Sequence, residues 1–165
     1  MNVSAPAKRK SAQDEDAANQ YLTFLLAGVE YGVDILKVQE IRSWEQPTML
    51  PNTLDYVLGV INLRGTVVPI IDLRRRFALD QAQFDQTTVV VVVKVTGADK
   101  ERTVGIVVDA VSEVYNVHDE QIRPAPDLGG AISTEFVKGL ATLDEKMLIL
   151  LDIDKLITAG VLREI

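Results

Sequence analysis

Short apolar runs alternate with turn residues along most of the chain, from Tyr21 onward. The runs are rich in β-branched side chains and the turn residues recur at roughly ten-residue intervals, a pattern typical of β proteins. Hairpins are predicted at residues 21–35, 59–73, 87–108 and 139–153. Little helix is predicted: a turn or two after Asp72, a short segment at 152–159, and a little around Asp34 or Leu54.

One predicted strand differs from the others because residues 89–93 are consecutive valines. A strand with one face in water alternates apolar and polar side chains, whereas an unbroken apolar run is typical of a strand buried on both faces. We therefore expect this strand to lie between two packed layers.

The chain also contains an internal repeat. The segment GVDILKVQEI at 32–41 aligns with GIVVDAVSEV at 105–114, and the hairpin at 56–73 aligns with that at 136–153. A unit of about sixty residues is too small to bury much apolar surface alone. The repeat therefore predicts an all-β protein made of two small closed barrels that share an apolar seam.

The predicted organisation has three parts. Residues 1–20 hold three basic and three acidic side chains and almost nothing large and apolar, so they are expected to form a flexible tail. Residues 21–83 are expected to form the first barrel and residues 84–165 the second, which would end in a short helix. These boundaries are approximate.

Composition narrows the class of function. The net charge of −7 disfavours binding to nucleic acid and to anionic lipid. The chain has no cysteine, which excludes disulfides and thiolate chemistry. No apolar stretch reaches the roughly eighteen residues of a membrane span. We expect a soluble cytoplasmic protein that does not insert into a membrane.

Catalytic constellations are largely missing from the sequence. His118 is the single histidine and has no metal-ligand spacing around it, so a surface position is favoured. Asp72 and Asp152 could act as an acid and base pair, but each follows a strand and precedes a short helical pattern, which favours helix capping. We predict no catalytic residue, no metal site and no cofactor.

Four other features could be structural or could bind a partner. Arg64 and Gly65 form a hairpin turn whose counterpart in the second repeat is acidic, so Arg64 either faces water or binds a partner. Glu40 is expected to point outward from an apolar strand. The basic cluster at 74–77 is interpreted as a solvated helix face. The connector at 43–53 carries Trp44 and Met49, either as satellite core or as an exposed anchor.

Five segments of the chain together resemble a known family. They are YGVDILKVQEI, GVINLRGTVVPIIDLRRRF, GIVVDAVSEV, IRPAP and GLATLDEKMLILLDIDKL. In this order and spacing they are similar to the CheW family of bacterial chemotaxis coupling proteins. The similarity runs from about Tyr21 to Leu156, and the run N-L-R-G-x-x-V-P-I-x-D-L is highly specific.

The resemblance implies two five-stranded SH3-like barrels joined across a hydrophobic seam and no catalytic activity. It implies two partners, the CheW-like regulatory domain of the histidine kinase CheA and the cytoplasmic hairpin tip of methyl-accepting chemoreceptors. It also implies recruitment from the cytoplasm to membrane-associated receptor arrays. By position, the kinase would contact Leu22, Ile35 and Val38. The receptor would contact the groove between the barrels at Glu40, Arg64, Val89, Gly105 and Val114.

Two other classes of function stay open at this point. The same fold could serve as a scaffold or regulatory module in a non-chemotactic kinase pathway. A small β-barrel enzyme using Asp72 or Asp152 is the third and least favoured alternative.

Overall fold

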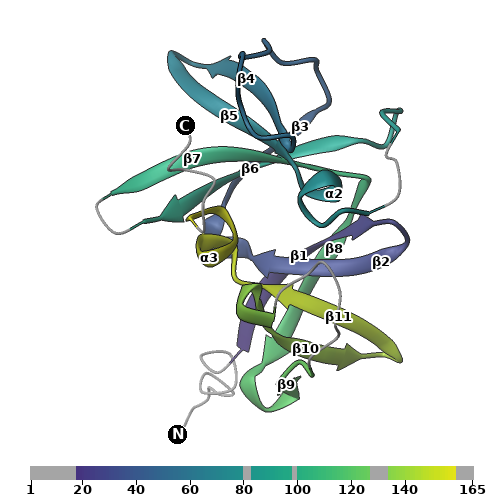
Figure 1. Ribbon diagram of the computed structural model, residues 1–165. Coiled ribbons are helices and arrows are strands. Elements are labelled where there is room, and N and C mark those ends of the chain that lie inside the picture. The colour runs from purple at the N-terminus through teal and green to yellow at the C-terminus, as the bar shows by residue number, and fades with distance from the viewer. Residues whose placement is uncertain (1–17, 80–82, 98–99, 127–133, 159–165) are drawn as a thin grey trace, which may run out of the picture.

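The computed structural model describes residues 18–79, 83–97, 100–126 and 134–158 (Figure 1). The strands are β1 Ala18–Leu26, β2 Val29–Asp34, β3 Val38–Ser43, β4 Val57–Leu63, β5 Thr66–Asp72, β6 Val89–Thr96, β7 Glu101–Val108, β8 Ala110–His118, β9 Ile122–Arg123, β10 Val137–Leu143 and β11 Lys146–Leu151. The helices are α2 Leu73–Arg76 and α3 Ile153–Thr158, with 3₁₀ turns η1 Ile35–Lys37, η2 Asp119–Gln121 and η3 Thr134–Phe136. The all-β class and the four predicted hairpins are confirmed.

The strands form two sheets, which exchange hairpins. One sheet has the order β3-β6-β7-β5-β4, and the other has the order β8-β1-β2-β11-β10-β9. The first hairpin, β1–β2, therefore joins strands of the second repeat, and β6–β7 joins strands of the first. The predicted boundary between residues 83 and 84 does not coincide with this division, because each sheet takes strands from both sides of it.

Each sheet curls into a barrel, and the two barrels close in different ways. In the five-stranded barrel (β3–β7), Thr48 lies just after β3 and exchanges two backbone hydrogen bonds with Val60 on β4, at 2.8 and 2.9 Å. In the six-stranded barrel (β1, β2 and β8–β11), the edge strands β8 and β9 are consecutive in the chain and are linked by η2. These connections join the two edges of each sheet.

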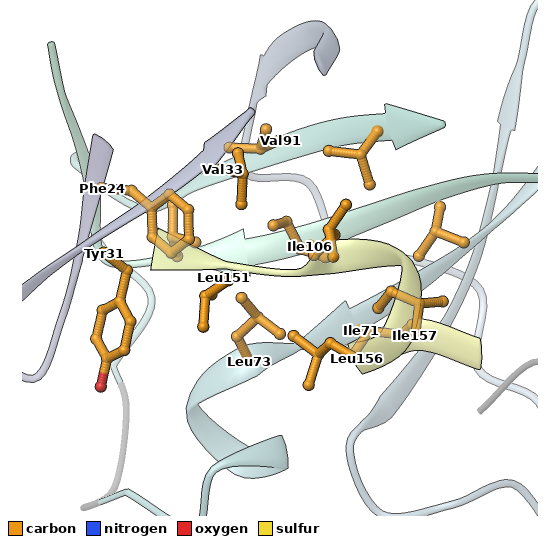
Figure 2. Close-up of a cluster of buried hydrophobic side chains, with 14 of the residues drawn as sticks. Phe24, Tyr31, Val33, Ile71, Leu73, Val91, Ile106, Leu151, Leu156 and Ile157 are labelled. Atoms are coloured by element: carbon orange, nitrogen blue, oxygen red, sulfur yellow. The ribbon is translucent and has the colours of Figure 1, made fainter. Parts of the chain in front are cut away.

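A large apolar cluster between the sheets, here called the seam, holds the barrels together (Figure 2). Phe24 and Val33 enter it from one sheet, Val91 and Ile106 enter it from the other, and Leu156 joins from α3. A smaller cluster fills the interior of each barrel. The predicted shared seam is thus present.

The consecutive valines behave as predicted. Val91 and Val93 belong to the seam, whereas Val90 and Val92 belong to the interior cluster of the five-stranded barrel. All four are at most 4% exposed. Strand β6 is apolar throughout this run because both of its faces are buried.

Strand β1 begins at Ala18 and so includes the last three residues of the predicted tail, 18–20. Ala18 is paired with His118 on β8, and Asn19 with Val117. Residues 18–20 are therefore part of the six-stranded sheet. The remainder of the predicted tail, residues 1–17, lies outside the described residues.

Candidate partner-binding surfaces

Arg64 and Gly65 form the two-residue turn between β4 and β5. Both residues have positive φ, 51° and 89°, the left-handed conformation of turns that match the twist of a hairpin. Asn62 stabilises the turn, because its side-chain oxygen accepts a hydrogen bond of 2.8 Å from the Gly65 N–H. The Arg64 side chain is 65% exposed. The turn therefore projects a guanidinium from the end of an apolar hairpin.

Arg64 donates a hydrogen bond to the carboxylate of Glu40 on β3. Arg42 lies 3.7 Å from the other oxygen of Glu40 and 3.8 Å from Glu45, so two cations and two anions alternate along this edge. The hydrogen bond from Arg64 holds the pKa of Glu40 below its ordinary value and raises the pKa of Arg64. The structure thus brings together two of the five predicted receptor residues as one exposed charged cluster.

Gly105, another predicted receptor residue, is buried in the five-stranded sheet. It lies opposite Val92 on β6 and Ile70 on β5, where β5 and β7 pair in parallel. A Cβ at this position would lie 2.7 Å from Ile70 Cδ1 and 2.8 Å from Val90 Cγ1. Gly105 is therefore a packing residue that permits close approach of strands, and it presents no side chain to a partner.

Of the last two predicted receptor residues, Val89 lies beside the charged cluster, because it is paired with Ser43 next to Arg42, whereas Val114 lies in the other barrel. Val89 begins β6, is half-buried and packs against the seam. Val114 is 44% exposed but belongs to β8 in the other sheet, where it is paired with Leu22. Of the predicted apolar receptor residues, Val114 has the larger surface available for contact.

The predicted kinase residues differ in exposure. Leu22 is 4% exposed and belongs to the seam, so its side chain is core and has almost no surface for a partner. Ile35 and Val38 are partly buried and pack against the seam at the start of the η1–β3 segment. The two barrels meet here, because β2 belongs to one sheet and β3 to the other.

Leu36, which the sequence analysis did not single out, is the most exposed large apolar residue in the described chain, at 86%. Asp34 caps η1 by accepting a hydrogen bond of 2.9 Å from the Leu36 N–H. A helical turn places Ile35 and Val38, three residues apart, on one face and leaves Leu36 on the other. A capping aspartate followed by adjacent apolar residues is the signal that could have revealed it.

The sequence analysis interprets the basic cluster at 74–77 as a solvated helix face, and the structure shows that this is wrong. Arg74 is 2% exposed and bonds to Asp72 and Asp109, while the guanidinium of Arg76 lies 5.3 Å from the ring centre of Tyr56. Arg75 alone of these three arginines is exposed. The prediction failed because the acidic partner Asp109 is distant in sequence.

The two aspartates considered for catalysis cap helices, as predicted. Asp72 accepts a hydrogen bond of 3.0 Å from the Arg74 N–H at the start of α2. Asp152 accepts one of 3.1 Å from the Lys155 N–H at the start of α3.

The connector after β3 combines both alternatives considered for it. Trp44 stacks on Phe84 with ring centres 4.3 Å apart and packs against the interior of the five-stranded barrel. Met49 is 73% exposed and, with Leu50, lines a surface pocket of about 510 Å³. Trp44 is thus satellite core and Met49 is surface.

The described residues also bear on metal binding and on membrane insertion. Among them, no three or more His, Asp or Glu side chains are placed to hold a metal ion. No helix in the described ranges is long and apolar enough to cross a membrane.

Comparisons with known proteins agree with the fold. The CheW-like domain family matches residues 20–160. The chain is 50% identical to "Chemotaxis protein CheW" of Klebsiella aerogenes over 145 residues, which cover 88% of this chain and 85% of the relative. It is 36% identical to "Probable chemotaxis protein CheW" of Rhizobium etli over 137 residues, or 83% and 86% of the two chains.

A solved structure gives the same result for the fold. The crystal structure of the scaffolding protein TtCheW from Thermoanaerobacter tengcongensis superposes with a TM-score of 0.77 at 33% identity. The match covers 87% of this chain and 90% of that one. A two-barrel protein with exposed apolar and charged surfaces belongs to the class of interaction modules. More specifically, this chain belongs to the CheW-like domain family.

Proposed function

We propose that this protein is a non-catalytic adaptor that couples chemoreceptors to the histidine kinase CheA and is recruited from the cytoplasm to receptor arrays. The observation that carries the proposal is the η1–β3 segment, residues 35–43. It presents an exposed apolar side chain, Leu36, and then Glu40 and Arg42, which form the charged cluster together with Arg64 from the β4–β5 turn. An adaptor needs two separate surfaces on one body, and surfaces of different chemistry suit different partners.

The apolar surface around Leu36 is proposed to receive the kinase. Leu36 is flanked by Ile35 and Val38, which are anchored in the seam, so the turn that presents it is fixed by packing. A side chain presented on a fixed turn requires little ordering of the backbone on binding and suits a partner pocket. Leu36 replaces Leu22, which is buried, as the main contact.

The charged cluster is proposed to receive the receptor tip, with Val114 as a separate apolar contact on the other barrel. Arg64 has further donors beside the one that bonds to Glu40, so it can donate to a partner carbonyl or carboxylate. Contacts of this kind depend on charge, and we therefore expect the receptor contact to weaken as salt is raised.

Reconstitution with CheA and receptor-bearing membranes tests the proposal by measuring kinase autophosphorylation and cosedimentation. We expect this protein to raise receptor-dependent autophosphorylation and to sediment with the membranes. Absence of both would contradict the proposed function.

Two variants separate the two contacts. Leu36→Asp is expected to weaken binding to the kinase domain by about 2 kcal/mol, roughly thirtyfold, because a charge is placed in an apolar contact. Arg64→Glu is expected to reduce receptor binding severely and binding to the isolated kinase domain much less. The matched controls Met147→Asp and Arg102→Glu change exposed residues elsewhere and are expected to retain both activities.

A further inference from the structure

The two short helices occupy corresponding places in the repeats, and each carries a charged residue at its second position. That residue is Arg74 in α2 and Asp154 in α3, and the aligned hairpins before the helices make these positions equivalent. Both helices lie between the two sheets, α2 against β7 and α3 against β6 (Figure 1). Their charges are opposite in sign.

Arg74 ties α2 to the point where the chain leaves the five-stranded barrel. Its guanidinium donates a hydrogen bond of 2.9 Å to Asp109, the residue between β7 and β8. The other carboxylate oxygen of Asp109 accepts a hydrogen bond of 2.8 Å from the Ala27 N–H, in the β1–β2 turn of the six-stranded barrel. The Asp109 carbonyl also accepts one from Thr87, in the connector before β6. Asp109 therefore joins α2 to both barrels.

Asp154 makes the corresponding connection with the opposite charge. Its carboxylate lies 2.8 Å from the Lys37 Nζ in η1, where the chain leaves the six-stranded barrel. Its other oxygen accepts a hydrogen bond of 2.7 Å from the Thr96 N–H, at the end of β6 in the five-stranded barrel. Lys37 also lies 3.5 Å from the Thr96 hydroxyl.

We infer that these two ion pairs, Arg74–Asp109 and Asp154–Lys37, are reciprocal clasps that fix the orientation of one barrel relative to the other. Apolar contacts across the seam hold the barrels together but are not directional, and hydrogen-bonded ion pairs supply direction. Each clasp joins a helix, a segment where the chain crosses between the barrels, and one end of an exchanged hairpin. That end is the β1–β2 turn in the first clasp and the end of β6 in the second. Opposite signs also prevent the two clasps from exchanging partners, because Arg74 would meet Lys37 and Asp154 would meet Asp109.

The second clasp has a further consequence that rests on the proposed function. Lys37 directly follows Leu36 in η1, so the bond to Asp154 holds the turn that presents Leu36. Lys37 and Asp154 are thus positioning residues for the kinase contact.

The test uses the free protein and a charge swap at the more exposed clasp, whose side chains are 28% and 29% exposed. The chain has no cysteine, so Thr66→Cys in one barrel and Thr142→Cys in the other provide two unique positions for spin labels. Pulsed electron paramagnetic resonance then measures the distance between the barrels in four proteins. These are the labelled parent, Lys37→Asp, the double variant Lys37→Asp with Asp154→Lys, and the control Lys155→Asp on the exposed side of α3.

Lys37→Asp places two carboxylates together and is expected to move or widen the distance distribution. The double variant restores opposite charges and is expected to return the parent distribution, as is the control. A distribution that is unchanged in Lys37→Asp would overturn the inference, and so would failure of the double variant to restore it. Circular dichroism on each protein shows that secondary structure is retained.

Binding of the unlabelled variants to the CheA regulatory domain provides the functional readout. Lys37→Asp is expected to lose about fivefold in affinity, and the double variant is expected to regain it, although Leu36 is unchanged in both. If no protein of the set binds the kinase domain, the proposed function fails, while the distance measurement still decides whether the clasps exist.

Discussion

The β4–β5 turn is formed by Arg64 and Gly65, and the corresponding β10–β11 turn by Asp144 and Glu145. All four residues have positive φ, so the backbones are alike. The side chains differ in charge, and Arg64 reaches back to Glu40 on β3. Where two repeats have the same backbone conformation, the requirements of folding explain that conformation. A difference in side chains between them is a better guide to binding than either turn alone.

The repeats also differ in how deeply their equivalent ion pairs are buried, and this difference predicts the largest effect. Arg74→Met leaves Asp109 without its cation and leaves the buried carboxylate of Asp72 with Arg75 alone, at 3.9 Å, so it is expected to lower the free energy of unfolding by about 3 kcal/mol. Lys37→Met affects a half-exposed pair and is expected to cost less than about 1 kcal/mol. Urea denaturation measures both, and equal losses would contradict the difference in burial.

Two equivalent glycines provide the second comparison. Gly105 and Gly32 both lie where strands pair in parallel, but a Cβ would lie 2.7 Å from Ile70 in the first case and 3.1 Å from Leu150 in the second. Gly105→Ala is expected to cost about 2 kcal/mol through overpacking, and Gly32→Ala less. Denaturation of both variants checks the order, and the reverse order would show that the six-stranded barrel is packed more tightly.

The two hairpin turns predict a smaller effect. Glu145 has a φ of 67° without being glycine, whereas its counterpart is Gly65. Glu145→Gly is expected to raise the free energy of unfolding by about 1 kcal/mol, because glycine adopts positive φ without strain. Gly65→Ala is expected to lower it by a similar amount. A loss of stability in Glu145→Gly would mean that the glutamate side chain stabilises its turn.

The smallest expected effect is a change in the pKa of one side chain, Glu40. The hydrogen bond from Arg64 lowers the pKa of Glu40, so this pair stabilises the fold above the ordinary glutamate pKa and loses that contribution as the pH falls through the lowered pKa. In Arg64→Ala the pKa of Glu40 is expected to rise toward its ordinary value. Nuclear magnetic resonance titration of the Glu40 side chain measures it, with Asp144→Ala as a control that leaves it unchanged.

Much of the local structure followed from the sequence because it depends on near neighbours. Alternating apolar runs predicted the hairpins, and Asp72 and Asp152 were identified as caps because their partners lie within three residues. The run of valines was correctly assigned to a strand buried on both faces. These inferences need periodicity and short-range hydrogen bonding alone.

The features that the sequence did not predict depend on distant partners. The exchange of hairpins leaves the repeat pattern unchanged, so the pattern does not tell which barrel a hairpin joins. The sequence favours a surface position for Arg74, because its partner Asp109 lies 35 residues away and the sequence pattern does not place the two together. Leu22 was assigned to a binding face and Leu36 was missed for the same reason, since burial is set by the packing of whole sheets.

The exchange of hairpins also determines the order in which the protein can fold during synthesis. The hairpin β1–β2 leaves the ribosome first, yet it pairs with β8 and with β11, where Tyr31 meets Ile149. The six-stranded barrel therefore stays incomplete until β11 has been made, at residue 151, while the five-stranded barrel has all its strands once residue 108 has emerged. Pairing over such distances closes large loops and slows folding. A nascent chain of this protein carries an unpaired apolar hairpin until β8 has been made, at residue 118, which is the stage at which chaperones would be needed.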